Sequence, residues 1–235
     1  MTQTITKKYL LTNGNRELKV DGIFTWSLPA LAAKLSTGKN FLVCPSAGIC
    51  SNLCYARSGT YNFSNVKAAH TKNLELVLNN SLEWKNRISK ELKTKRYQNN
   101  KSLRIHDSGD FFSAEYFELW IEIAKENPHV FFYAYTKEVS IVKRYALPEN
   151  FVIIYSMGGT QDHLIDKDND RHADVFPSLE ALQEAGYTDQ EHSDLLAATL
   201  PTNKIGIVVN NIKHLKKRQG QETFGSLQVK AKESK

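Results

Sequence analysis

Hydrophobic positions along the chain follow two patterns, which are short continuous apolar runs and one longer stretch with a helical period. Runs of Val, Ile, Phe and Tyr bounded by turn-forming residues predict buried strands. The predicted strands are Phe41–Cys44, Leu103–His106, Val130–Tyr135, Phe151–Tyr155 and Ile205–Val209. Apolar residues between Ser64 and Lys93 recur every 3.6 positions and predict one long helix.

Three shorter helices are predicted from their terminal residues. Ser113 can cap a helix that stops before Pro128, a short helix starts at Glu138, and another runs from Ser178 until Gly186. Strands that alternate with helices indicate parallel pairing through right-handed crossovers. Five or six strands are too few for an eight-stranded barrel. We therefore expect the α/β class, as a partial or compact parallel (β/α) barrel.

Composition narrows the class of protein without naming a function. A chain of 235 residues with 41% hydrophobic residues is long and apolar enough for one globular domain. We expect that domain at residues 1–212, followed by a basic, partly flexible tail at 213–235. No apolar run reaches the length of a membrane span, and the first residues lack a secretory pattern. We therefore expect a cytoplasmic protein without membrane contact; the oligomeric state stays open.

Charge is strongly segregated along the sequence. Residues 1–104 carry 17 basic and 5 acidic groups, whereas residues 105–200 carry 6 basic and 18 acidic groups. The basic half and the basic tail are suited to contact with the phosphates of a nucleic acid. The alternatives are that the two halves attract each other, or that the basic residues between Lys85 and Arg96 form a solvated helix face.

The three cysteines of the chain lie within eleven residues. Cys44, Cys50 and Cys54 have the spacing C-x5-C-x3-C in a segment rich in Pro, Ser, Gly and Asn, which indicates a loop. Clustered thiolates are soft ligands that select zinc or an iron–sulfur cluster. Three thiolates suit a [4Fe–4S] cluster with one open iron. Zinc would need a fourth ligand, for which His70 is the nearest candidate, or a water. A disulfide is a third, weaker alternative.

Four segments between residues 25 and 160 carry a resemblance to a known family: TWSLPALAAKLSTGKNFLVCPSAGICSNLCYA, RIHDSGDFFSAEYFELW, FYAYTK and LPENFVIIYS. They resemble the phage gene product eighty-eight family, which is similar to radical S-adenosylmethionine (SAM) proteins. This resemblance implies a barrel of the radical-SAM type, a [4Fe–4S] cluster on the three cysteines and SAM on the open iron. It assigns Tyr55, directly after the third cysteine, to cofactor binding. The common radical-SAM spacing is C-x3-C-x2-C, which differs from the spacing here.

The loop after the strand Leu103–His106 collects polar residues. Loops at the carboxyl ends of parallel strands carry the chemistry in α/β folds. The resemblance assigns Ser108 and Gly109 to cofactor binding and Asp110 to the ammonium group of SAM. Asp107 and Asp110 are also candidate catalytic residues. The alternative is that both aspartates cap the next helix.

Two further strand ends are predicted at the same edge. Lys137 is a candidate catalytic residue that pairs with a carboxylate or phosphate of the ligand, or else the first exposed residue of a helix. Ser156 precedes a Gly158–Gly159 turn, where backbone can approach a ligand closely, and is a candidate for cofactor binding. Arg104, inside a strand, is predicted to point into the barrel lumen toward a carboxylate.

One acidic segment imitates a metal site. Asp166, Asp168 and Asp170 match the first half of a calcium loop, but the Gly and Glu that such a loop needs are missing. We interpret it as an exposed acidic loop. We expect no role for the flanking His163 and His172.

These observations leave three hypotheses for function. The leading one is a radical-SAM-like iron–sulfur enzyme of phage type, acting in the host cytoplasm on a nucleic acid or nucleotide. The second is a zinc-containing DNA or RNA base transglycosylase-like enzyme. In it, His70 completes the metal site, and Asp107 serves as base or base reader. The third is a non-catalytic, metal-stapled module that binds nucleic acid or a protein.

Overall fold

The computed structural model describes residues 8–99 and 101–234, and a parallel sheet organises them. Seven strands pair in the order β1-β4-β5-β6-β7-β9-β8, and all six pairs are parallel. Within the described residues β1 and β8 lie at opposite edges, so the sheet is open rather than a closed barrel. The strands are β1 Ile23–Trp26, β2 Ala32–Lys34, β3 Asn40–Leu42, β4 Ser102–Ile105, β5 Phe131–Thr136, β6 Phe151–Ser156, β7 His172–Phe176, β8 Thr188–Asp189 and β9 Lys204–Val208.

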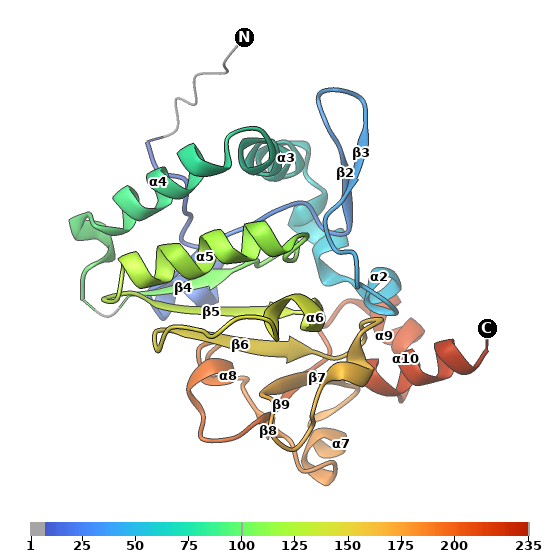
Figure 1. Ribbon diagram of the computed structural model, residues 1–235. Coiled ribbons are helices and arrows are strands. Elements are labelled where there is room, and N and C mark those ends of the chain that lie inside the picture. Colours follow the sequence, from blue (N-terminus) through green and yellow to red (C-terminus); the bar gives the residue numbers. More distant parts are fainter. Residues whose placement is uncertain (1–7, 100, 235) are drawn as a thin grey trace.

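Helices cover both faces of this sheet. In Figure 1, α4 and α5 lie on one side of β5 and β6, and α8 lies on the other. The α-helices are α1 Arg16–Val20, α2 Cys50–Leu53, α3 Ser64–Asn79, α4 Ser81–Leu92, α5 Ala114–Glu126, α6 Val139–Val142, α7 Leu179–Glu184, α8 Leu196–Thr199, α9 Lys213–Gln219 and α10 Phe224–Glu233. The 3₁₀ turns are η1 Tyr55–Arg57, η2 Gly59–Asn62, η3 Lys95–Tyr97 and η4 Asp162–Leu164.

The sequence pattern predicts four of the sheet strands, β4, β5, β6 and β9, within one or two residues. The predicted strand Phe41–Cys44 does not belong to the parallel sheet, so this prediction is wrong. The strand found there, β3, pairs antiparallel with β2 in a separate hairpin. The single helix predicted between Ser64 and Lys93 is two helices. It breaks at Asn80, whose backbone leaves the helical region (φ −146°, ψ 54°). Asn side chains compete for backbone hydrogen bonds and so favour such breaks.

Helix caps follow the sequence closely. The Ser113 side chain accepts a hydrogen bond from the Tyr116 backbone, and the Ser178 side chain accepts one from that of Ala181. Each bond satisfies one of the backbone N–H groups that lack a partner in the first turn of a helix. The helix after the Asp107–Asp110 loop is thus capped by Ser113, so the prediction that these aspartates cap it is wrong.

Three fully buried tryptophans join β1 to the helices on one face of the sheet. The Trp84 ring lies 5.6 Å from that of Trp26 and 5.0 Å from that of Trp120. Beside them, the Lys85 ammonium forms ion pairs with two carboxylates of α5, including Glu122 at 2.8 Å. These ion pairs join one basic residue of the first half of the chain to acidic residues of the second half.

The opposite face of β4 and β5 carries a buried ionic network. The Arg104 guanidinium lies 3.0 Å from the Asp194 carboxylate and 3.6 Å from that of Asp107. It also stacks over the Tyr135 ring, and the Tyr133 hydroxyl donates to Asp194. Arg104 therefore points toward a carboxylate, as predicted, but it does so on one face of an open sheet rather than in a barrel lumen. The segment before α8 supplies that carboxylate, and so fills this face of the sheet with protein.

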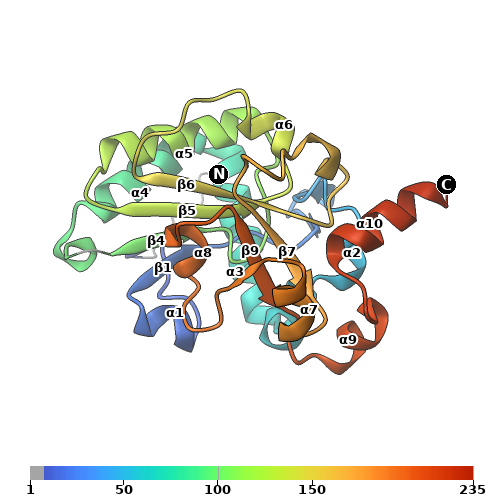
Figure 2. The same cartoon turned by 90° about the horizontal axis from the view of Figure 1, so that it is seen from below.

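The C-terminal segment from residue 213, which we expected to be a partly flexible tail, contains α9 and α10. Phe224, Gly225 and Gln228 of α10 are buried, and Gly225 donates its backbone N–H to Asp174 of β7. Both views place α9 and α10 beside α2, at the end of the molecule toward which β6 runs (Figures 1 and 2). No helix among the described residues has the length and apolar character of a membrane span.

Residues 166–170 form a loop in which the Asp166 carboxylate accepts hydrogen bonds from the backbone of Asp168 and Asn169. Asp166 and Asp168 are exposed, which confirms the interpretation as an exposed acidic loop. His172 is fully buried in β7 and bonds to the Tyr187 hydroxyl, whereas His163 is exposed.

The Arg104 network predicts a large stability effect of Asp194→Asn. The substitution leaves a buried guanidinium with Asp107 as its remaining ion-pair partner, and breaking a buried pair costs about 3 kcal/mol. We expect that loss in the free energy of unfolding by urea. The control, Asp168→Asn, removes an exposed carboxylate and should change it by less than about 0.5 kcal/mol. Equal effects of the two substitutions would contradict the network's role.

Candidate functional site

The cysteine loop, residues 44–54, is fixed against the carboxyl end of the sheet. The Glu138 carboxylate, directly after β5, accepts hydrogen bonds from the backbone N–H of Ser46 at 2.8 Å and from its hydroxyl at 2.9 Å. Gln161 donates to the same hydroxyl, and the Ser46 carbonyl accepts from the Thr160 backbone. Sequence reasoning missed Glu138, because its partner lies 92 positions away.

Close backbone packing holds the middle of the cysteine loop. Gly48 has φ +51°, and a Cβ there would lie 2.4 Å from Oε1 of Gln228 and 2.7 Å from the Gly158 carbonyl. The backbone N–H of Cys50 donates to that Gly158 carbonyl, and that of Ile49 donates to Gln228. The turn after β6 and helix α10 therefore both position the loop, while contact of this turn with a ligand stays a prediction.

The three thiols lie close enough to affect one another's ionisation. The Cys54 thiol donates a hydrogen bond to Cys50 and lowers the pKa of Cys50, while the same hydrogen bond and burial raise the pKa of Cys54. Burial raises the pKa of Cys44, and the nearby Asp110 carboxylate raises it further. The structure thus brings the three predicted ligands together.

Within residues 8–99 and 101–234, no group of three or more His, Cys, Asp or Glu side chains is arranged so that it could hold a metal ion. The thiols of Cys44, Cys50 and Cys54 share one half-buried loop, but they are not arranged as metal ligands. The fit of a metal group therefore depends on the chemistry of this donor set. Three soft thiols with no other cysteine in the chain suit an iron–sulfur cluster or, with a further ligand, zinc.

Asp110 and Lys137 lie beside the thiols and are both buried. The Asp110 carboxylate accepts from the Thr136 hydroxyl at 2.6 Å, from the Lys137 backbone at 3.0 Å and from the Phe111 backbone at 2.8 Å. Burial raises its pKa, and these hydrogen bonds oppose the rise. Asp110 therefore ties the loop after β4 to the end of β5. Its contact with the SAM ammonium stays a prediction.

The Lys137 ammonium crosses to the end of the next strand. It donates to the Ser156 hydroxyl at 2.6 Å and to the carbonyls of Ser156 and Met157. With Lys137 only 8% exposed, the prediction of an exposed first helix residue is wrong. Its positive charge lowers the pKa of both Cys44 and Cys50, so it would offset negative charge on the thiolates.

Ser108 and Gly109 pack the loop after β4 against the chain that leads to the cysteines. The Ser108 hydroxyl donates to the Leu28 carbonyl at 2.5 Å. Gly109 has φ +92°, and a Cβ there would lie 2.6 Å from that of Leu28. Glycine is required here for both backbone angle and space. Contact of either residue with a cofactor stays a prediction.

Asp107 faces the aromatic residues that follow the third cysteine. The Tyr61 hydroxyl donates to its carboxylate at 2.5 Å, and the Tyr55 hydroxyl donates to its carbonyl at 2.5 Å. Arg104 pairs with the same carboxylate. Tyr55 therefore links the cysteine loop to the loop after β4. Tyr61 was missed, because nothing in its local sequence distinguishes it from a surface aromatic.

His106 directly follows β4 and has a left-handed conformation, with φ +64°. Its ring is buried, and burial lowers its pKa to about 3, so the ring is neutral. The Tyr116 hydroxyl accepts from the Trp26 ring nitrogen and lies 2.9 Å from Nε2 of His106. Left-handed backbone costs a non-glycine residue about 1–2 kcal/mol, which the surrounding core sustains. His106 therefore sets the direction of the loop.

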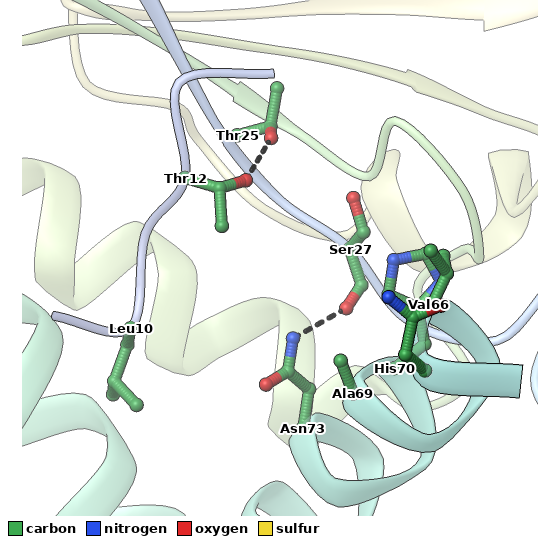
Figure 3. A pocket seen from close by; sticks show the side chains of 9 residues that line it. Leu10, Thr12, Thr25, Ser27, Val66, Ala69, His70 and Asn73 are labelled. Carbon is green, nitrogen blue, oxygen red and sulfur yellow. Dashed lines mark hydrogen bonds between the residues drawn. The ribbon is translucent and has the colours of Figure 1, made fainter. Parts of the chain in front are cut away.

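His70 lies on α3 beside a separate pocket of about 250 Å³ between that helix and β1 (Figure 3). Its Nδ1 lies 3.3 Å from the Ser108 hydroxyl, which already donates to Leu28, so the ring N–H is the donor. Asn73 from the same helix donates to the Ser27 carbonyl in this pocket. Among the described residues, His70 and the three cysteines do not form a group that could hold a zinc ion.

The environment of Glu138 predicts a pH dependence of stability. Burial raises the pKa of Glu138 from 4.5 to about 7, and the Asp110 charge contributes. The folded chain then binds more protons than the unfolded chain, so the free energy of unfolding falls as pH rises through that window. Urea titrations of the wild type and Glu138→Gln should show the wild type losing stability relative to the variant between those pH values. A pH-independent difference would contradict this assignment.

Comparison with known proteins places the chain in a family. The model for the family described as Gene product 88 matches residues 5–234. The Gene 88 protein of Mycobacterium phage L5 is 32% identical over 110 residues, which cover 44% of this chain and 46% of that protein. The match thus spans about half the length of this curated relative. No solved structure matches the chain. Since the family model covers nearly all of the sequence, this protein belongs to the gene product 88 family.

Proposed function

We propose that the protein is an iron–sulfur enzyme of radical-SAM type, with a [4Fe–4S] cluster on Cys44, Cys50 and Cys54 and SAM at the open iron. The observation that carries the proposal is that the three thiols lie near one another, with Asp110 and Lys137 close enough to shift the pKa of Cys44 and Cys50. Asp110 follows β4 and bonds to the backbone of Lys137 after β5, and the Cys50 backbone bonds to Gly158 after β6, so these residues lie at the carboxyl end of the sheet.

The strand order gives independent support. From β1 through β7 the order in the sheet follows the order in the chain, without a reversal. Right-handed crossovers of that kind wind the chain in one direction, as in a barrel opened along one side. The cysteine loop comes after the first strand of this series, and the polar loops come after the next three.

The chain's own residues hold and neutralise the site. A cluster held by Cys44, Cys50 and Cys54 would supply the one-electron reduction of SAM, and bound SAM would supply hydrogen-atom abstraction from the substrate. Glu138 and Gln161 fix the loop through Ser46, and Lys137 offsets the charge of the thiolates. The loop at Ser108 and Gly109, together with Ser156, would position SAM. Because the cofactors carry the difficult chemistry, binding and orientation are the protein's share.

The test is reductive cleavage of SAM under anaerobic conditions. Protein reconstituted with iron and sulfide, reduced with dithionite and given SAM should release 5′-deoxyadenosine, measured by chromatography. Cys50→Ala and Cys54→Ala should reduce the yield to background, because each removes one of three ligands. The matched control is Thr60→Ala, an exposed residue in the following η2 turn, which should retain the wild-type yield.

Two results would contradict the proposal. One is a cluster-loaded wild type that releases no 5′-deoxyadenosine. The other is a cysteine variant that keeps its circular dichroism spectrum and still cleaves SAM at the wild-type rate.

A further inference from the structure

A second pocket lies against the outer side of the cysteine loop, where α2 and η1 meet α9. It has a volume of about 160 Å³. Its lining residues are Ser51, Asn52, Cys54, Arg57, Ser58, His214, Leu215 and Arg218. The two walls come from parts of the chain more than 150 residues apart, and the Ser58 hydroxyl lies 3.4 Å from Nε2 of His214 across them.

The charge of this pocket has one sign. Arg57, Arg218 and His214 line it, and no carboxylate is among the described residues that do. Neither guanidinium takes part in an ion pair within residues 8–99 and 101–234. Two arginines that line one pocket without a counter-charge give it a positive potential, which favours a bound anion.

Both guanidiniums are held in place by the cysteine loop. Nη1 of Arg57 donates to the Ser51 carbonyl at 2.8 Å, and Nη1 of Arg218 donates to the Asn52 carbonyl at 3.2 Å. A guanidinium has five N–H donors, so each keeps most of them for another acceptor. Holding the side chain in advance lowers the entropy lost when a ligand binds.

We propose that this pocket binds the phosphate group of a nucleotide or nucleic acid. Planar guanidiniums bind phosphate oxygens through two parallel hydrogen bonds. The volume is below the roughly 300 Å³ of pockets that enclose drug-sized ligands, so it takes a phosphate while the sugar and base lie outside. Because Cys54 lines the same pocket, the bound phosphate lies beside the cysteine loop. The binding itself does not depend on a cluster.

The test measures binding of three probes by calorimetry: inorganic phosphate, adenosine monophosphate and a short single-stranded oligonucleotide. Arg57→Gln and Arg218→Gln should each weaken binding by roughly tenfold or more, since each removes charged hydrogen bonds to phosphate. Arg218→Lys keeps the charge but loses the paired donors, so its affinity should lie between that of the wild type and that of Arg218→Gln. The affinities for adenosine monophosphate and for the oligonucleotide are then compared. Tighter binding of the first indicates a free nucleotide as the source of the phosphate, and tighter binding of the second indicates a polymer.

The matched control is Lys217→Gln, which removes one positive charge from the same helix at a residue that does not line the pocket. It should change affinity by less than about twofold at physiological salt, where screening weakens distant charges. Circular dichroism and iron content of each variant establish that the fold and the cysteine site are intact. Failure of all three probes to bind the wild type would overturn the inference. Equal losses in Lys217→Gln and the arginine variants would overturn it as well.

Discussion

Two buried carboxylates at the carboxyl end of the sheet determine the arrangement of the candidate site. Asp110 is satisfied by groups at the end of β5, and Glu138 by Ser46 of the cysteine loop. A buried carboxylate without such partners is very costly, so these loops have few other arrangements available. The charge of Asp110 also raises the pKa of Glu138. The thiols meet beside these groups because both loops are held at the same edge.

Contacts from distant parts of the chain complete this arrangement. Gln228 of α10 holds the backbone of Ile49, Arg218 of α9 reaches Asn52, and Gly158 after β6 receives the N–H of Cys50. The C-terminal helices are thus part of the cysteine site rather than an appendage. This agrees with a family match that extends to residue 234. It also means that truncation before α9 would disturb the loop as well as remove basic charge.

Local signals made part of this structure predictable. Some features depend only on neighbouring residues, so the sequence shows them directly. They are the serine caps at Ser113 and Ser178 and the apolar runs of β5 and β6. Strand β7 was missed because its sequence, HADVF, contains a buried His and Asp that satisfy their hydrogen bonds with distant groups. The sequence showed which residue types make up the site, but it did not show which distant residues they contact. Glu138, Asp194 and Tyr61 become recognisable only once the fold brings them to Ser46, Arg104 and Asp107.

The proposed function depends on an iron–sulfur site at the three thiols rather than a zinc site or a metal-free loop. The most direct measurement is the content of iron, acid-labile sulfide and zinc in the wild-type protein purified without oxygen. We expect about four irons and about four sulfides per chain. One zinc without iron, or a folded protein that takes up neither metal, would contradict it.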